Sequence, residues 1–279
     1  MRLTALLLSL FVLQPASTEI RLVVKGDDMG AGHGINLATI DAYRRGVLRT
    51  TNVIVPGPWF LEAARLLREN PGLDVGVHLA ITSEWENVKW RPLTYAKSIV
   101  DEDGYFFPAV GPRPGFPPNR SIKEAAWKLD EIERELRAQL DSAKRHLPQA
   151  TYTWYHMGFT SLDPTVRDLA AKLTKEYGLV QPMDLGIKPI GRIYESKDSG
   201  AVKADKLAAR LETLEPGLWL QIDHAATNDP EIQAMGHVGY EWVAADRSAN
   251  LEMWTSPKVR EVIQRRGIKL TDYREITKK

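Results

Sequence analysis

Two adjacent carboxylates follow the first apolar segment of this sequence. Leu22–Val24 is short and β-branched, and it is soon followed by Asp27, Asp28 and Gly30. The pattern predicts a buried parallel strand with both acids at its carboxyl end, where α/β proteins commonly carry active-site groups. Adjacent carboxylates repel each other unless a cation or a shared proton relieves them. We therefore expect one acid to bind a metal and the other to handle a proton, although Asp-Asp-x-Gly also suits a plain turn.

Three of the six histidines occupy matching positions, because each comes at the end of a predicted strand. They are His78 after 74–77, His156 after 151–155, and His224 after 219–223. Parallel strands share one carboxyl-end rim, so these side chains are predicted to lie beside the paired acids. A single strand histidine is commonly a hydrogen-bonded core residue, but three of them together with a double aspartate predict a functional rim.

Two histidine nitrogens and one carboxylate oxygen, with positions left open for water and substrate, form a common hydrolytic metal site. Such a site lowers the pKa of bound water. It still requires a base to take the proton and an acid to protonate the leaving group. Asp27 and His224 are the groups left for these two tasks.

Apolar periodicity predicts strands that alternate with helices along most of the chain. The expected strands are 22–24, 50–55, 73–79, 151–155, 217–222 and 268–270, with a short strand and turn within 179–193. The expected helices are 35–45, 59–70, 121–146, 164–177, 204–214 and 256–266, the third opened by a Ser121–Glu124 capping box. Because the alternation continues to the C-terminus without a domain boundary, it favours a single-domain α/β fold, a (β/α) barrel.

The N-terminus has the features of a secretory signal peptide. Met1-Arg2 precedes the apolar stretch Leu3–Leu13, which is shorter than the roughly 20 residues of a transmembrane helix, and small residues follow it. We expect residues 1–18 to be removed on export to the periplasm or the medium. The mature domain is then 19–279, with no membrane insertion after processing.

Cysteine is absent, and the 37 basic and 36 acidic residues nearly balance. The absence of cysteine excludes disulfides, thiolate metal sites, cysteine nucleophiles and lipid attachment at cysteine. A mixed surface of near-zero net charge offers no basic field, so neither nucleic acid nor anionic lipid is expected as a partner.

Several motifs resemble those of the YdjC-type carbohydrate deacetylases, which act on N-acetylated oligosaccharides such as chitooligosaccharides. The resemblance runs over nearly the whole mature chain. Its segments are Gly26–Gly30 with Met29 for the family's Phe, Gly76–Leu79, Tyr155–Gly158, Asp223–Ala225, Arg247 followed by Leu251, and Gly267–Leu270. Many members carry several histidines in the third of these segments, whereas this chain has only His156 there.

The resemblance implies a distorted, TIM-like (β/α) barrel and a metal-dependent hydrolase that removes N-acetyl groups from an amino-sugar oligosaccharide. It implies that Asp28, His78 and His156 bind one divalent ion, Mg²⁺ or Zn²⁺. It further implies that Asp27 is the base and that His224 is the proton donor.

Residues 81–120 interrupt the alternation. They are rich in proline and aromatic residues and have no clear periodicity. A loop of this length in a compact domain is usually functional, so we expect a lid or a binding wall. Trp85 and Trp90 are predicted to stack on sugar rings, or else to form a small core of the insert itself. Arg247 is predicted to reach the substrate site, where it either holds Asp27 ionised or pairs with its neighbour in sequence, Asp246.

Two other functions stay open at this point. One is a metal-dependent hydrolase of another ester or amide, and the other is an exported, non-catalytic sugar-binding protein. A glycosidase fits less well, because its two carboxylates must flank the bond several ångströms apart. The sequence is compatible with a homodimer.

Overall fold

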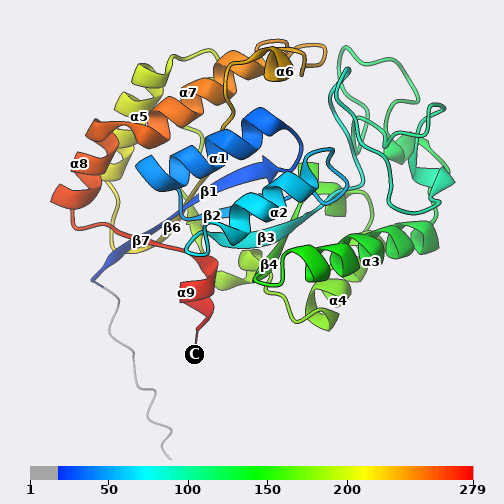
Figure 1. Cartoon of the computed structure of the whole chain (residues 1–279), viewed down its shortest axis with the longest axis horizontal. Helices are drawn as coiled ribbons and strands as arrows, with labels where there is room; N and C mark the ends of the chain where they lie inside the picture. The colour runs from blue at the N-terminus through cyan, green and yellow to red at the C-terminus, as the bar shows by residue number, and fades with distance from the viewer. Residues whose placement is uncertain (1–17, 279) are drawn as a thin grey trace, which may run out of the picture.

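The computed structural model describes residues 18–278, and its centre is a sheet of parallel strands (Figure 1). The strands are β1 (Ile20–Met29), β2 (Thr50–Val53), β3 (Asp74–Leu79), β4 (Tyr152–Tyr155), β5 (Lys188–Pro189), β6 (Gly217–Asp223) and β7 (Lys269–Thr271). Their order is β4-β3-β2-β1-β6-β5, with β7 paired to the first part of β1. All pairings between these strands are parallel, so their carboxyl ends lie on one side.

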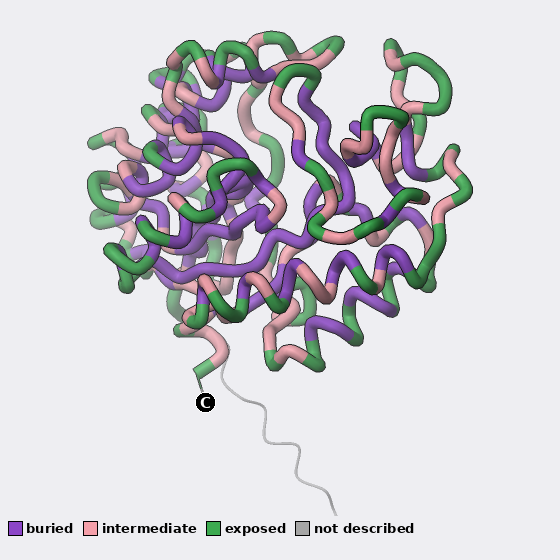
Figure 2. The backbone as a smooth tube through the Cα atoms, turned by 45° about the vertical axis from the view of Figure 1, so that its right-hand side comes forward, coloured by how far each residue is buried: buried purple, intermediate pink, exposed green. Residues whose placement is uncertain are grey.

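Helices surround this sheet. They are α1 (His33–Arg45), α2 (Phe60–Arg68), α3 (Leu129–His146), α4 (Pro164–Glu176), α5 (Gly200–Glu212), α6 (Pro230–Gln233), α7 (Val243–Thr255), α8 (Pro257–Arg265) and α9 (Tyr273–Thr277). In Figure 1, α5, α7 and α8 lie together on the left and α3 and α4 at the lower right. Strands β2 and β3 are buried throughout and β1 over most of its length, and Figure 2 shows long purple stretches inside the molecule with green and pink turns on its outside.

The sheet curls so that one of its faces encloses a small apolar cluster. Val23, Tyr152 and Tyr273 form this cluster and are fully buried, and Trp154 packs against them. A much larger core lies between the strands and the surrounding helices. The predicted fold class is therefore confirmed: the chain is a single-domain, distorted (β/α) barrel whose sheet stays open.

Besides the short unpredicted helices α6 and α9, two longer helices differ from the sequence-based prediction. The helix expected from residue 121 begins at Leu129, because Ala125 is extended. Ser121 does donate to Glu124 (Oγ to Oε2, 2.6 Å), but this contact closes a single 3₁₀ turn. Helix α7 was not predicted, because it buries polar residues such as Asn250 and so lacks a clean apolar stripe.

The insert 81–120 is irregular and has a buried interior, which includes Trp85, Trp90 and Phe106. It is attached to α3 by an acid of that helix, since the Glu135 carboxylate accepts the backbone N–H groups of residues 93 and 94 at 3.1 and 2.9 Å. The two tryptophans predicted to contact substrate, Trp85 and Trp90, are thus both buried within the insert. The insert lies at the upper right of Figure 1, on the side toward which the arrow of β1 points.

The predicted signal peptide, residues 1–18, lies outside the described residues except for its last position, and export stays a prediction. Within residues 18–278, no helix combines the length and the apolar character that crossing a membrane would require.

Asp74, at the opposite end of β3 from the strand-end histidine, gives a testable feature of the fold. Its carboxylate is buried and accepts hydrogen bonds from Thr50 Oγ1 (2.9 Å) and Thr151 Oγ1 (2.7 Å). Burial raises the pKa of Asp74 to about 6, since these hydrogen bonds only partly offset the loss of solvation. The folded state therefore holds a proton between about pH 4 and 6 that the unfolded chain has released.

We predict that Asp74→Asn removes this titration. Because the native pKa is raised, the free energy of unfolding that Asp74 contributes falls as pH rises through this window, by about 1.4 kcal/mol per pH unit and about 2–3 kcal/mol in total. Urea denaturation of both proteins between pH 4 and 7.5 measures the difference. The wild type should lose its advantage as pH rises. A difference that is independent of pH, like that expected for the exposed control Asp168→Asn, contradicts the account.

Candidate metal centre and active site

A β-bulge in β1 brings the two adjacent acids into one pocket. Gly26 pairs with Thr51 and Met29 with Val53, so β1 carries one residue more than β2 across this interval. Asp28 absorbs the extra residue with φ of 71°, a left-handed conformation that aspartate tolerates better than most residues. Regular alternation would turn neighbouring side chains to opposite faces, whereas here both carboxylates line the same pocket.

Three potential ligand atoms converge at the carboxyl ends of β1, β3 and β4. Asp28 Oδ1 lies 3.4 Å from His78 Nε2 and 3.4 Å from His156 Nδ1, and the two nitrogens are 3.3 Å apart. Ligands held about 2.0–2.1 Å from a tetrahedral Zn²⁺ lie about 3.3–3.4 Å from one another. Asp28 Oδ1 is also buried, and no hydrogen bond from the described residues reaches it. An orphaned carboxylate oxygen beside two imidazole nitrogens fits a metal ion well.

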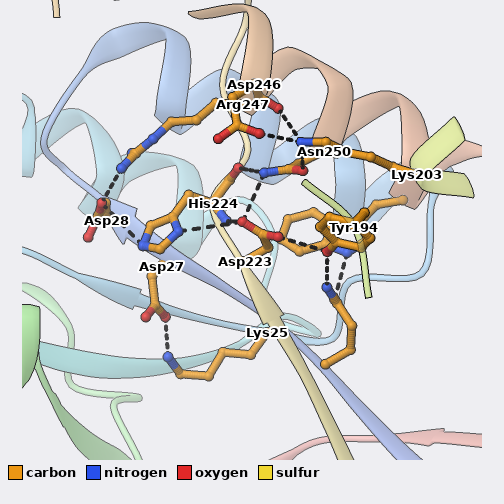
Figure 3. Close-up of polar contacts among 12 residues, drawn as sticks. Lys25, Asp27, Asp28, Tyr194, Lys203, Asp223, His224, Asp246, Arg247 and Asn250 are labelled. Carbon is orange, nitrogen blue, oxygen red and sulfur yellow. Dashed lines mark hydrogen bonds and ion pairs between the residues drawn. The ribbon is translucent and has the colours of Figure 1, made fainter. Parts of the chain in front are cut away.

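The second oxygen of Asp28 faces positive charge. Arg247 Nη2 donates to Oδ2 at 2.9 Å, and His224 Nε2 lies 3.6 Å from the same oxygen (Figure 3). Burial alone raises the pKa of Asp28, but His224, Arg247 and the two neighbouring imidazoles together hold it well below its usual range. The carboxylate is therefore ionised and ready to bind a cation.

The two imidazoles have different surroundings. Burial is the largest influence on His78 and lowers its pKa, which favours the neutral form that coordinates metals. Burial acts in the same direction on His156, but the carboxylates of Glu84 and Asp28 outweigh it and raise the pKa of His156 to about 10. A metal ion that binds His156 must therefore displace a proton.

Asp27 has a cationic partner that the sequence analysis missed. Lys25, two residues earlier in β1, is fully buried and forms an ion pair with Asp27 Oδ1 (Figure 3). Asn52 Nδ2 donates to the same oxygen at 2.9 Å, and Lys25 Nζ lies 4.1 Å from the centroid of the Trp154 ring. The signal was present, since a lysine inside a predicted buried strand requires a partner, and residues i and i+2 share one face.

His224 extends from the end of β6, with about a third of its side chain exposed. Its Nε2 faces Asp28, and its Nδ1 lies 3.6 Å from Asp223 Oδ1. Burial lowers the pKa of His224, but Asp28 and Asp223 outweigh burial and the nearby Arg247, so the net shift is upward. A solvent-reachable imidazolium at this position can donate a proton.

A buried polar network holds the backbone at His224. Asn250 Nδ2 donates to the His224 carbonyl (2.8 Å) and to Asp223 Oδ1 (2.9 Å). Lys203 in turn donates to Asn250 Oδ1 at 2.7 Å and forms an ion pair with Asp246 (Figure 3). The polar residues of α7 therefore support the site, which explains their burial.

The pocket around these groups has a volume of about 350 Å³. Its lining includes all five predicted catalytic and metal-binding residues, Asp27, Asp28, His78, His156 and His224, together with Trp85 and Arg247. The sequence analysis did not select Glu84, Arg113, His237 or Tyr240, which also line it.

The two predicted tryptophans have different positions. Trp85 lines the pocket and is buried, with its ring stacked on His237 at a centroid distance of 5.8 Å. Trp90 is not among the lining residues that the structure describes, and it packs behind His156 with ring centroids 5.7 Å apart. Of the two, Trp85 alone lines the pocket, and Arg247 Cζ lies over its ring at 4.9 Å from the centroid.

Arg247 lines the pocket as predicted, but its ion-pair partner is neither of the two expected. It binds Asp28, while Asp27 pairs with Lys25 and Asp246 pairs with Lys203. The physical reason is the bulge, which turns Asp28 toward α7, together with two buried lysines that could not be assigned partners from spacing alone.

The chain is similar to known proteins over most of its length. The chain matches the family of YdjC-like proteins over residues 21–265. It is 29% identical to a carbohydrate deacetylase of Thermus thermophilus, over 87% of this chain and 89% of the relative, and 25% identical to carbohydrate deacetylase 2 of Listeria innocua, over 93% and 100%.

A solved structure shares the fold. It is that of an Enterococcus faecalis protein described as a candidate cellobiose-phosphate cleavage protein, with a TM-score of 0.72, 22% identity, and coverage of 92% of this chain and 99% of that one. The family match extends from β1 to the end of α8 and so includes every predicted site residue. The chain belongs to the YdjC-like protein family.

Proposed function

We propose that this protein is a metal-dependent deacetylase that hydrolyses the N-acetyl group of an amino-sugar oligosaccharide. The observation that carries the proposal is the convergence of Asp28, His78 and His156 in one pocket that Asp27 and His224 also line. The names of the relatives from Thermus and Listeria support a carbohydrate deacetylase.

The bound ion is assigned to Asp28 Oδ1, His78 Nε2 and His156 Nδ1. We favour Zn²⁺ over Mg²⁺, because two of the three donors are imidazoles and their spacing matches a tetrahedral site. A divalent ion here would polarise the acetamide carbonyl and lower the pKa of a water molecule at the site.

The other residues supply proton transfer and charge balance. Lys25 and Asn52 both bind Oδ1 of Asp27, which orients the carboxylate and leaves Oδ2 to take a proton from the attacking water. His224 then protonates the departing amine. Arg247 stays on Asp28 and keeps this ligand anionic throughout the cycle.

The wall of the pocket suits a sugar ring. Trp85 and His237 are stacked with an interplanar angle of 17°, and Tyr240 lies 6.1 Å from Trp85 between ring centroids. Flat aromatic surfaces of this kind pack against the C–H faces of pyranose rings. We therefore assign substrate contacts to the half-exposed His237 and Tyr240 of this wall, with the buried Trp85 supporting His237.

Removing a ligand should remove metal and activity together. We predict that Asp28→Ala or His78→Ala loses stoichiometric metal and at least about 100-fold in turnover. Metal content of purified protein and acetate release from N-acetylglucosamine oligomers measure the two effects. His33→Ala is a suitable control, because that half-exposed side chain pairs with Glu62 away from the pocket. Full acetate release by a metal-free Asp28→Ala protein contradicts the mechanism.

Loss of the base should reduce turnover without reducing metal affinity. We predict that Asp27→Asn retains the ion, because Asn still accepts from Lys25 and Asn52, but loses about 10²–10⁴-fold in kcat. Isothermal titration with Zn²⁺ and steady-state kinetics measure affinity and turnover on the same preparation. Wild-type turnover in this variant shows that another group takes the proton.

A further inference from the structure

Glu84 contacts His156 at Nε2, the ring nitrogen that points away from the predicted ion site. Its side chain is buried, and its Oε2 lies 2.8 Å from His156 Nε2. The other ring nitrogen, Nδ1, faces Asp28 Oδ1 and His78 Nε2. The His156 ring therefore bridges a carboxylate on one side and the predicted ion site on the other.

This arrangement decides which nitrogen of His156 is free to coordinate. Neutral imidazole carries one N–H, and an acceptor at Nε2 places the proton there, leaving the lone pair on Nδ1. Metal-binding histidines commonly donate their second N–H to a carboxylate, which fixes the ring and increases its basicity. His78 has no equivalent support, because its Nδ1 is buried and has no hydrogen-bond partner among the described residues.

The backbone of the insert fixes Glu84 from both sides. Ser83 N donates to the Phe107 carbonyl at 3.0 Å, and Ser83 Oγ accepts from Trp90 N at 3.0 Å. On the far side, Glu86 N donates to the Gly236 carbonyl at 2.9 Å. Residues 83 to 86 are thereby tied both to the rest of the insert and to the loop that carries the aromatic wall.

Glu84 is not itself part of the ligand set. The ligand atoms that lie within 4.8 Å of one another belong to Asp28, His78 and His156. Glu84 approaches the other edge of the His156 ring, so the imidazole stands between its carboxylate and those atoms. Its action on a bound ion must therefore pass through His156.

We propose that Glu84 is a positioning residue of the metal centre, which accepts the Nε2–H of His156 and so presents Nδ1 to the ion. The inference rests on the proposed metal-dependent function. It also assigns residues 81–90 a fixed structural role. This part of the insert is a permanent wall of the site and does not open and close over it as a lid.

Metal affinity of matched variants tests this assignment. Glu84→Ala should weaken Zn²⁺ binding about 10–100-fold, whereas Glu84→Gln should lose much less, because its amide oxygen still accepts the N–H. The matched control is Glu86→Ala, whose exposed side chain is two residues away and which should bind like the wild type. Competition against a chromophoric chelator gives the affinities, and circular dichroism confirms that each variant is folded.

A spectroscopic readout separates positioning from general stability. In the Zn²⁺-loaded wild type, the Nε2–H of His156 should give a proton resonance protected from solvent exchange, assigned by its loss in His156→Ala. Glu84→Gln should keep this resonance and Glu84→Ala should lose it. Wild-type affinity and an unchanged resonance in Glu84→Ala overturn the inference and leave the proposed function intact. A wild-type protein that binds no Zn²⁺ overturns both.

Discussion

The structure depends on the compensation of one buried carboxylate. Asp28 is almost fully buried, and a charged group in that position is costly unless opposite charge surrounds it. One of its oxygens has Arg247, and the other has two imidazole nitrogens and space for a cation. The remaining polar groups of the site can be understood as keeping this charge in place while a second carboxylate stays available beside it.

That separation of two neighbouring acids follows from the backbone. The bulge in β1 gives Asp28 a left-handed conformation and turns it toward α7. Asp27 instead forms an ion pair with Lys25 inside the curled sheet. Each carboxylate thus has its own basic partner, Arg247 for Asp28 and Lys25 for Asp27. Two acids that are adjacent in sequence thereby face different partners, which allows them to perform different tasks.

The sequence predicted those parts of the site that follow from strand topology. Asp28, His78 and His156 come together because parallel strands deliver their ends to one rim, and apolar periodicity was sufficient to locate those strands. Pairings between distant side chains could not be predicted in this way. The partner of Arg247 depends on a one-residue bulge, and Glu84 reaches the site from an insert without periodicity. Helix α7 was not predicted because its buried face carries polar residues. The reason for their burial is their contact with the site, which the sequence alone does not show.

The central claim is that the three strand-end side chains hold one metal ion. The most direct measurement is anomalous diffraction at the zinc edge from crystals of the active protein grown with Zn²⁺. The account predicts a single strong peak bonded to Asp28 Oδ1, His78 Nε2 and His156 Nδ1, with Arg247 still on Oδ2. An active protein whose crystals show no peak at these three atoms, or an ion bound at another site, would contradict it.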